Sequence, residues 1–367
     1  MPTASEWRVT LVNLALCGAA VGYLHTSTAF NSWLGDTYAA SHGVLSHRMT
    51  EGVVSVASFA IAAFFYSFVD AFGVLKLQTA SVQVDKGTLV VRAATAHSTK
   101  RGRTVGFSVG KTEEVASSFL PSTSAATFAF WLVLNVGLYL GLIDVSQRIL
   151  GDSIADLHFA PADAPSVLRM VTEVAFSVWA YDFVFWWIHA SWHATFPVDE
   201  STLWGRVVRR WRSWHLQHHD HYKLASEPLH PMATFHHHFL DAAGQVGINI
   251  LVQQIPLGFL FPGPRHKLSK VLHNVAVTYL LVEAHCGFDL PWMSHRLFPA
   301  LFGGSVRHQI HHQHGTVYFH QFFRYLDDWF YGASSTGAGL KKLVEAGGGD
   351  VAADIPEATQ GPPRRWA

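Results

Sequence analysis

The chain has 367 residues and is apolar, with 49% hydrophobic and only 14% charged residues, against about 25% charged in an ordinary soluble protein. Lys plus Arg and Asp plus Glu number 26 each, so net charge does not favour a nucleic-acid partner. Two cysteines, Cys17 and Cys286, are too few for a disulfide framework or a cysteine-based metal site. The composition, with a mean hydropathy of +0.18, predicts a polytopic membrane protein.

Six apolar stretches follow one another along the chain, each with about the 20 residues that a bilayer core requires. We expect the first to be a signal anchor rather than a cleaved signal peptide, since no convincing cleavage site follows its single basic residue, Arg8. The fifth carries several polar side chains, so it is expected to be broken, re-entrant or packed inside a helical bundle. The stretches cover about residues 9–30, 52–75, 126–150, 166–192, 239–261 and 268–288.

The loops between these stretches differ in charge. Residues 76–124 carry seven Lys or Arg, which places them in the cytoplasm by the positive-inside rule, whereas the acidic loop 151–165 is expected in the lumen. The basic segment after the fourth stretch is again predicted to be cytoplasmic. Arg265, Lys267 and Lys270 conflict with this scheme, because they fall in a loop predicted to be luminal. Residues 81–91 alternate apolar and polar side chains, which predicts a short hairpin.

Histidines form three clusters in the second half of the chain, with the sequences HASWH, HLQHH and HQIHH. On a helix, residues three and four apart share a face, so each cluster is expected to present its imidazoles in one direction. Eight clustered imidazoles exceed what a single ion can bind, which favours two metals. The clustered residues are His189, His193, His215, His218, His219, His308, His311 and His312.

Imidazole-rich sites without thiolates suit iron, zinc, copper or nickel. A zinc hydrolase would need about three protein ligands and a water, and a short motif such as HExxH is expected for it. Two irons can oxidise C–H bonds, which side chains cannot do unaided. His285 is a candidate ninth ligand, with Asp289 as a further ligand or as a carboxylate that orients an imidazole. Asp182, seven residues before His189, is expected to orient an imidazole too.

These motifs, in this order, resemble the fatty acid hydroxylase / sterol desaturase superfamily from about residue 176 to residue 332. The surrounding words DFVFWWIHASWH, WHLQHH, EAHCGFDLPWMSHRLFP and FFRYLDDWFYG also match. The last two are most similar to those of the sterol hydroxylases and sterol C4-methyl oxidases in that superfamily. The chain departs from the pattern at Asp289, where some relatives have a histidine, and at Ala190 and the Gly332-Ala333 pair.

The resemblance implies two iron ions, dioxygen as co-substrate, an endoplasmic-reticulum membrane location, and electrons from a cytochrome b5-type donor and its reductase. The expected fold is an all-α membrane bundle of about six spans with a cytoplasmic, histidine-rich di-metal cap. Three regions are expected: residues 1–125 with two spans and the basic insert, the catalytic region 126–332, and a disordered tail 333–367. Arg209, Arg210 and Arg212 are candidates for docking an acidic electron carrier, or else mark topology or contact anionic lipid.

The expected reaction is O2-dependent hydroxylation of a lipid C–H bond, with a sterol as the favoured substrate. A sterol or fatty-acyl desaturase of the same superfamily is the alternative, because both reactions begin with hydrogen abstraction. A metal transporter or storage protein is the remote alternative, since histidine-rich stretches also serve those functions, but a transporter would place its ligands near mid-membrane on several spans. Other histidines near the clusters are read as interfacial, structural or supporting residues.

Overall fold

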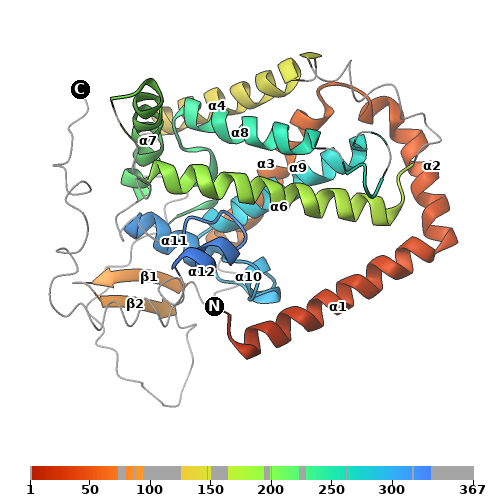
Figure 1. The fold of residues 1–367 in the computed structure, drawn as a ribbon, viewed down its shortest axis with the longest axis horizontal. Helices are drawn as coiled ribbons and strands as arrows, with labels where there is room; N and C mark the ends of the chain where they lie inside the picture. Colours follow the sequence, from red (N-terminus) through yellow and green to blue (C-terminus); the bar gives the residue numbers. More distant parts are fainter. Residues whose placement is uncertain are drawn as a thin grey trace.

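The computed structural model describes the following residues: 2–72, 80–85, 88–93, 125–146, 148–149, 164–193, 199, 201–222, 229–255, 257–261, 263, 265–315 and 318–331. Within these ranges the protein is helical apart from one hairpin (Figure 1). The predicted disordered tail, the acidic loop 151–163 and most of the basic insert lie outside the described residues.

The N-terminal region forms three helices, α1 (Ala4–Thr26), α2 (Thr28–Leu45) and α3 (Thr50–Phe72). A capping box between Thr3 and Glu6 begins α1. Ser27 has an extended backbone and its hydroxyl accepts from the Phe30 N–H, so it ends α1 and caps α2. The apolar stretch predicted at 9–30 therefore crosses a helix boundary. Helix α2 was not predicted, because the apolar stretch runs through Ser27 and so gave no sign of a helix end there.

The six predicted spans are not confirmed as such. Among the described residues, two helical segments, Ala4–Thr26 and Thr50–Val69, are long and apolar enough to cross a membrane, and Leu132–Ser146 is a shorter apolar segment. The other stretches are helical but carry buried polar groups: α6 (Val167–Trp192), α8 (Phe239–Gln254) and α9 (Lys267–His285). The helix of the fifth stretch ends at Gln254, before the predicted end near residue 261. This agrees with the expectation that the polar side chains interrupt this stretch.

The core lies between α6, α8 and α9, with α3 packed along α9 and α4 (Ala125–Ser146) along α8 (Figure 1). Tyr181, Phe185 and Trp192 of α6 pack with Ile248 of α8 and Val277 of α9. On the other side of α9, side chains of α3 form a second apolar cluster with residues 282–293. Helix α3, from the predicted N-terminal region, thus shares a core with α9, from the predicted catalytic region. The boundary predicted near residue 125 stays a prediction.

Three further elements lie near the ends of α6 and α9: α7 (Leu203–Tyr222), η2 (Pro231–Phe235) and α11 (Gly304–His314). Gly315 ends α11 in the left-handed region at φ 67°, with its N–H bonded to the His311 carbonyl. The single-turn α10 (Ser294–Leu297) precedes α11 in the chain. After α11 the chain returns beside α6, and its described part ends in α12 (Tyr325–Tyr331). These elements position the histidines.

The hairpin predicted at residues 81–91 is confirmed. Strand β1 (Ala80–Asp85) pairs antiparallel with β2 (Thr88–Ala93), in a register that places Ala80 opposite Ala93 and Asp85 opposite Thr88. Only two residues connect the strands, as a tight hairpin turn requires.

Gly244 offers a test of the packing between α7 and α8. A Cβ atom at this position would overlap the Trp211 ring, whereas nothing lies within 4 Å of a Cβ at Gly247 on the same helix. We expect Gly244→Ala to lower stability by about 1–3 kcal/mol through overpacking, despite the helix propensity of up to about 1 kcal/mol that alanine adds. Gly247→Ala is the matched control and should be neutral or stabilising. Thermal unfolding in detergent measures both, and equal midpoints for the two variants would contradict the packing described.

Candidate metal centre

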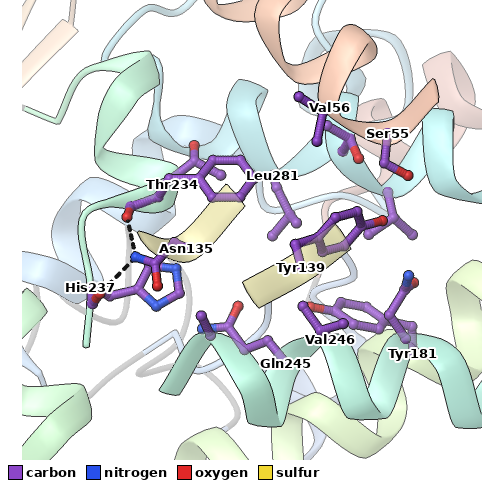
Figure 2. Close-up of a pocket in the computed structure, with 15 residues that line it drawn as sticks. Ser55, Val56, Asn135, Tyr139, Tyr181, Thr234, His237, Gln245, Val246 and Leu281 are labelled. Carbon is purple, nitrogen blue, oxygen red and sulfur yellow. Dashed lines mark hydrogen bonds between the residues drawn. The ribbon is translucent and has the colours of Figure 1, made fainter. Parts of the chain in front are cut away.

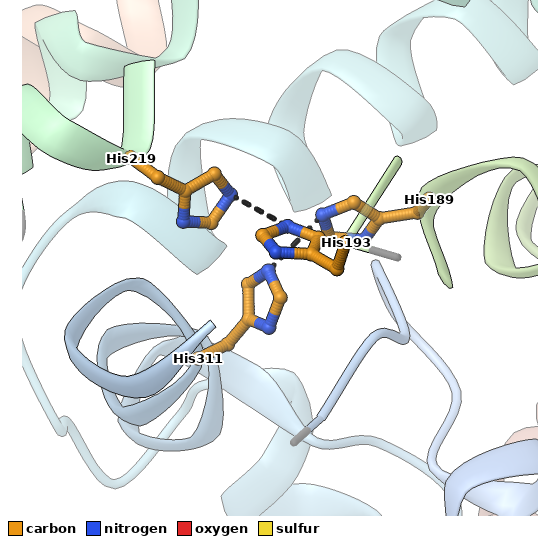
Figure 3. A group of neighbouring side chains, drawn as sticks. All are labelled: His189, His193, His219 and His311. Atoms are coloured by element: carbon orange, nitrogen blue, oxygen red, sulfur yellow. Dashed lines mark hydrogen bonds between the residues drawn. The ribbon is translucent and has the colours of Figure 1, made fainter. Parts of the chain in front are cut away.

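Five histidines from three segments form the first group at the C-terminal end of α6. The ligand nitrogens of His189, His193, His219 and His311 lie within 4.8 Å of one another, and Figure 3 shows their rings converging from α6, α7 and α11. The Nε2 of His215 lies 3.0 Å from that of His219 and 3.2 Å from that of His193, so it belongs to the same group. We call these residues the five-histidine group.

The second group contains the other four predicted ligands. The nitrogens of His218, His285 and His312 also lie within 4.8 Å of one another. His308 joins them, because its Nε2 lies 3.0 Å from the Nε2 of His285 and 3.2 Å from that of His312. The structure thus brings together all nine histidines that the sequence analysis named, in a five-histidine group and a four-histidine group. Whether they bind metal stays a prediction.

Each HxxHH motif divides its side chains between the two groups. In α7, His215 and His219 join the five-histidine group and His218 joins the other. In α11, His308 and His312 join the four-histidine group and His311 joins the other. Successive helical residues point about 100° apart, while residues four apart share a face. The adjacent histidines at the end of each motif therefore point into different groups, and the two groups are neighbours.

Backbone carbonyls fix the tautomer of three imidazoles. The Nδ1 atoms of His189, His218 and His285 lie 2.8, 3.0 and 2.8 Å from the carbonyl oxygens of Phe319, His236 and Leu281 respectively. A carbonyl oxygen only accepts, so each Nδ1 carries the proton and donates it. Each Nε2 is then left as a lone-pair donor that faces the other imidazoles, as metal ligation requires.

A fully buried carboxylate on α8 performs the same task for His215. The Nδ1 of His215 lies 3.2 Å from Asp241 Oδ2, and His237 lies 3.5 Å from the same oxygen. The sequence analysis treated Asp241 only as one of the polar residues that weaken the fifth stretch. The rule that assigned a role to Asp182, namely a carboxylate within an apolar helix, would have found Asp241 as well.

Four imidazoles on α7 and α11 are held neutral. Burial, followed by the proximity of neighbouring imidazoles, lowers the pKa of His218, His219, His308 and His312 well below the ordinary histidine value. Neutral imidazole is the ligating form. Converging Nε2 lone pairs without protons need a cation between them, so the donor set fits two metal ions of the kind that imidazole binds, including iron.

The two acidic residues proposed as supporting groups contact other partners. Asp182 accepts from the backbone N–H groups of Gln321, Phe322 and Phe323 rather than from an imidazole. It therefore holds the segment that carries the Phe319 carbonyl. Its predicted role as a supporting carboxylate stays a prediction, and its partners lie in a segment remote in sequence.

Asp289 lies against His295 and Arg296, neither of which belongs to the two groups. Burial alone would raise the pKa of Asp289, but the hydrogen bonds from His295 and Arg296 outweigh it and lower the pKa to about 2. A similar pair joins His320 to the buried Asp327, which also accepts from the Trp186 indole N–H. Asp289 and Asp327 thus fix the loops around the site.

The basic run of α7 has two kinds of member. Arg209 and Arg210 are exposed, and the Arg210 guanidinium lies 5.7 Å from the centre of the Trp214 ring. Arg212 is half-buried and donates to the Ser191 carbonyl at 3.1 Å, which ties α7 to the end of α6. Arg212 therefore also has a packing role, and its predicted part in docking stays a prediction.

An apolar pocket adjoins the histidines. It lies between α3, α4, α8 and α9 (Figure 2), and its empty volume of about 630 Å³ includes the solvent at its open side. A second cavity is lined by seven of the nine histidines together with Phe185 and Gln321. Four residues line both spaces, so the pocket leads to the histidines: Thr234, His237, Gln245 and Leu281.

Comparison with curated proteins finds relatives of two names. A cholesterol 25-hydroxylase-like protein of Danio rerio is 28% identical over 208 residues, which are 54% of this chain and 72% of that protein. Cholesterol 25-hydroxylase of Homo sapiens is 27% identical over 47% of this chain and 57% of its own length. A protein of Dictyostelium discoideum, provisionally named methylsterol monooxygenase, is 26% identical over 47% of this chain and 54% of its own length.

The resemblance to the fatty acid hydroxylase / sterol desaturase superfamily is confirmed. The chain spans 72% of the Danio rerio relative but only a little over half the length of the other two. No family model and no solved structure matches the chain. The names of these superfamily members support lipid or sterol oxidation in general terms.

Asp241 provides a test of how the site is held. We expect Asp241→Leu to lower metal affinity about 10- to 100-fold, because His215 loses the acceptor that fixes its tautomer and orientation. Asp289→Leu removes a buried carboxylate outside the two groups and should leave metal affinity unchanged. Metal titration of the purified variants measures both. A larger loss in the Asp289 variant would identify Asp289 as the residue that supports the metals.

Proposed function

We propose that the protein is a membrane-bound non-haem di-iron oxygenase that hydroxylates a C–H bond of a lipid, with a sterol as the favoured substrate. The observation that carries this proposal is the convergence of nine imidazoles in two groups at the end of an apolar pocket. The relatives' names, sterol hydroxylase and methylsterol monooxygenase, support the same class of reaction.

The five-histidine group would hold one iron and the four-histidine group the other. When bound, the irons supply the dioxygen chemistry that side chains lack. Overall, one oxygen atom enters the C–H bond to give an alcohol, and the other leaves as water after two electrons and two protons are delivered. The surrounding residues keep the imidazoles neutral, fix their Nδ1 protons and hold their Nε2 atoms in place.

The substrate would enter through the apolar pocket. Its walls include Val56, Val246 and Val277, and its inner end opens beside His218 and His285. Such walls stabilise hydrocarbon and exclude water from the reacting carbon. Two helices long and apolar enough to cross a membrane accompany this pocket, which supports a bilayer as the source of the substrate. We infer an endoplasmic-reticulum location with the metals facing the cytoplasm.

The electrons would come from a cytochrome b5-type donor and its reductase. The exposed guanidinium groups of Arg209 and Arg210 lie on α7, the helix that also carries three of the nine histidines. A positive surface close to the metals would steer an acidic carrier there.

Two other functions make different predictions. A desaturase would begin with the same hydrogen abstraction but would release an alkene, so analysis of the product separates the two. A metal transporter would place its ligands at the middle of several spans, whereas here they lie at the ends of α6 and α9 and on α7 and α11.

The His218→Ala variant tests the metal assignment. We expect purified wild-type protein to hold about two irons, and this variant about one, because His218 belongs to the smaller group. O2-dependent alcohol formation should fall at least about 100-fold. His25→Ala, an exposed histidine of α1, should change neither. Metal analysis and mass spectrometry of the lipid product measure these effects, and a single zinc with hydrolase activity would overturn the proposal.

The docking surface is tested by replacing Arg209 and Arg210 with glutamine. The apparent KM for an acidic cytochrome donor should rise several-fold at low salt, since steering is lost, and the difference should shrink as ionic strength rises. Iron content should not change. Arg48→Gln, an exposed arginine bonded to Asp144 on α4, serves as the control. An unchanged KM in the double variant would place the donor elsewhere.

A further inference from the structure

The boundary between the apolar pocket and the histidine cavity contains a hydroxyl without a partner. Among the described residues, nothing accepts from or donates to Thr234 Oγ1, although Thr234 is only 8% exposed. Thr234 lines both spaces, so its hydroxyl lies where they meet. A buried polar atom without a partner is costly unless a ligand supplies one.

Asn135 offers an acceptor close by. Its Nδ2 donates to the carbonyl oxygens of Phe235 and His237, at 2.7 and 2.9 Å, and Figure 2 shows these bonds. The two bonds fix the orientation of the amide, so Oδ1 is left as the acceptor. Within the described part of the chain, Asn135 Oδ1 has no hydrogen-bond partner, and the residue is 1% exposed.

Asn249 and Ser55, at the far end of the pocket, are already paired. Asn249 donates to Asn274 Oδ1 at 2.8 Å and accepts from His273 Nε2 at 2.7 Å. Ser55 donates to the Glu51 carbonyl at 2.7 Å. The remaining wall between the two ends is largely aliphatic and aromatic. The demand for a polar ligand group therefore lies at the histidine end of the pocket, and the hydrocarbon fits the rest.

We propose that Thr234 and Asn135 bind the hydroxyl of an amphipathic lipid, so that the carbon presented to the histidines lies within a few bonds of that hydroxyl. A hydroxyl matches both atoms, because it can accept from Thr234 and donate to Asn135. In a sterol the hydroxyl lies on the ring system, at the opposite end from the side chain. The site thus favours a ring position near the hydroxyl over the tip of the side chain. This inference rests on the proposed function.

The test is binding without turnover. The purified protein is titrated, in the absence of oxygen, with tritiated cholesterol and with its 3-deoxy analogue. We expect the wild type to bind cholesterol about tenfold more tightly, the effect of one or two hydrogen bonds. Thr234→Val should reduce this ratio to about one through loss of cholesterol affinity alone. Unchanged binding of the 3-deoxy analogue shows that the variant pocket is folded.

Two further variants make the result decisive. Thr234→Ser retains the hydroxyl and should keep the ratio. Thr278→Val makes the same change as Thr234→Val at a residue that lines the apolar pocket but not the histidine cavity, and it should keep the ratio too. Equal wild-type binding of the two sterols, or a ratio lost only in the Thr278 variant, would overturn the inference. The protein could instead bind cholesterol selectively but hold no iron and form no product with oxygen. That result would overturn the proposed function and leave the assignment of Thr234 and Asn135 standing.

Discussion

Nine imidazoles are withdrawn from water with their Nε2 nitrogens facing one another, and the rest of the structure depends on keeping them there. Burial lowers the pKa of His218, His219, His308 and His312, so these imidazoles are neutral and ready to ligate. Carbonyls of Phe319, His236 and Leu281 and the carboxylate of Asp241 each accept a hydrogen bond from an Nδ1 atom. These acceptors fix the tautomer and orientation of the rings, so that the Nε2 lone pairs of these imidazoles point into the two groups.

The surrounding fold follows from that requirement. The Phe319 carbonyl lies next to a segment that Asp182 holds through three backbone N–H groups, and Asp327 holds the Phe319 and His320 N–H groups themselves. Helices α8 and α9 carry Asp241 and His285 toward the site and also form walls of the apolar pocket. The same helices thus place the imidazoles and lead a lipid to them.

The histidines and their shared helical faces could be predicted from spacing alone, because the motifs are local and helix geometry is regular. The division of each HxxHH motif between two groups follows from the same geometry. The acceptors could not be predicted in this way, since Phe319 lies 130 residues from His189 and Asp241 lies 26 residues from His215. Asp182 was chosen correctly as a buried carboxylate, but its partners depend on the return of a distant segment. Apolarity also overestimated the number of clear spans, because α6, α8 and α9 carry apolar surfaces that pack on one another as well as buried polar groups.

A structure of the iron-loaded protein, determined with anomalous scattering at the iron absorption edge, tests the central claim most directly. We expect two iron peaks per chain, one surrounded by Nε2 atoms of the five-histidine group and the other by those of the four-histidine group. A single peak, or a peak ligated by Asp289 in place of a histidine, would contradict the account.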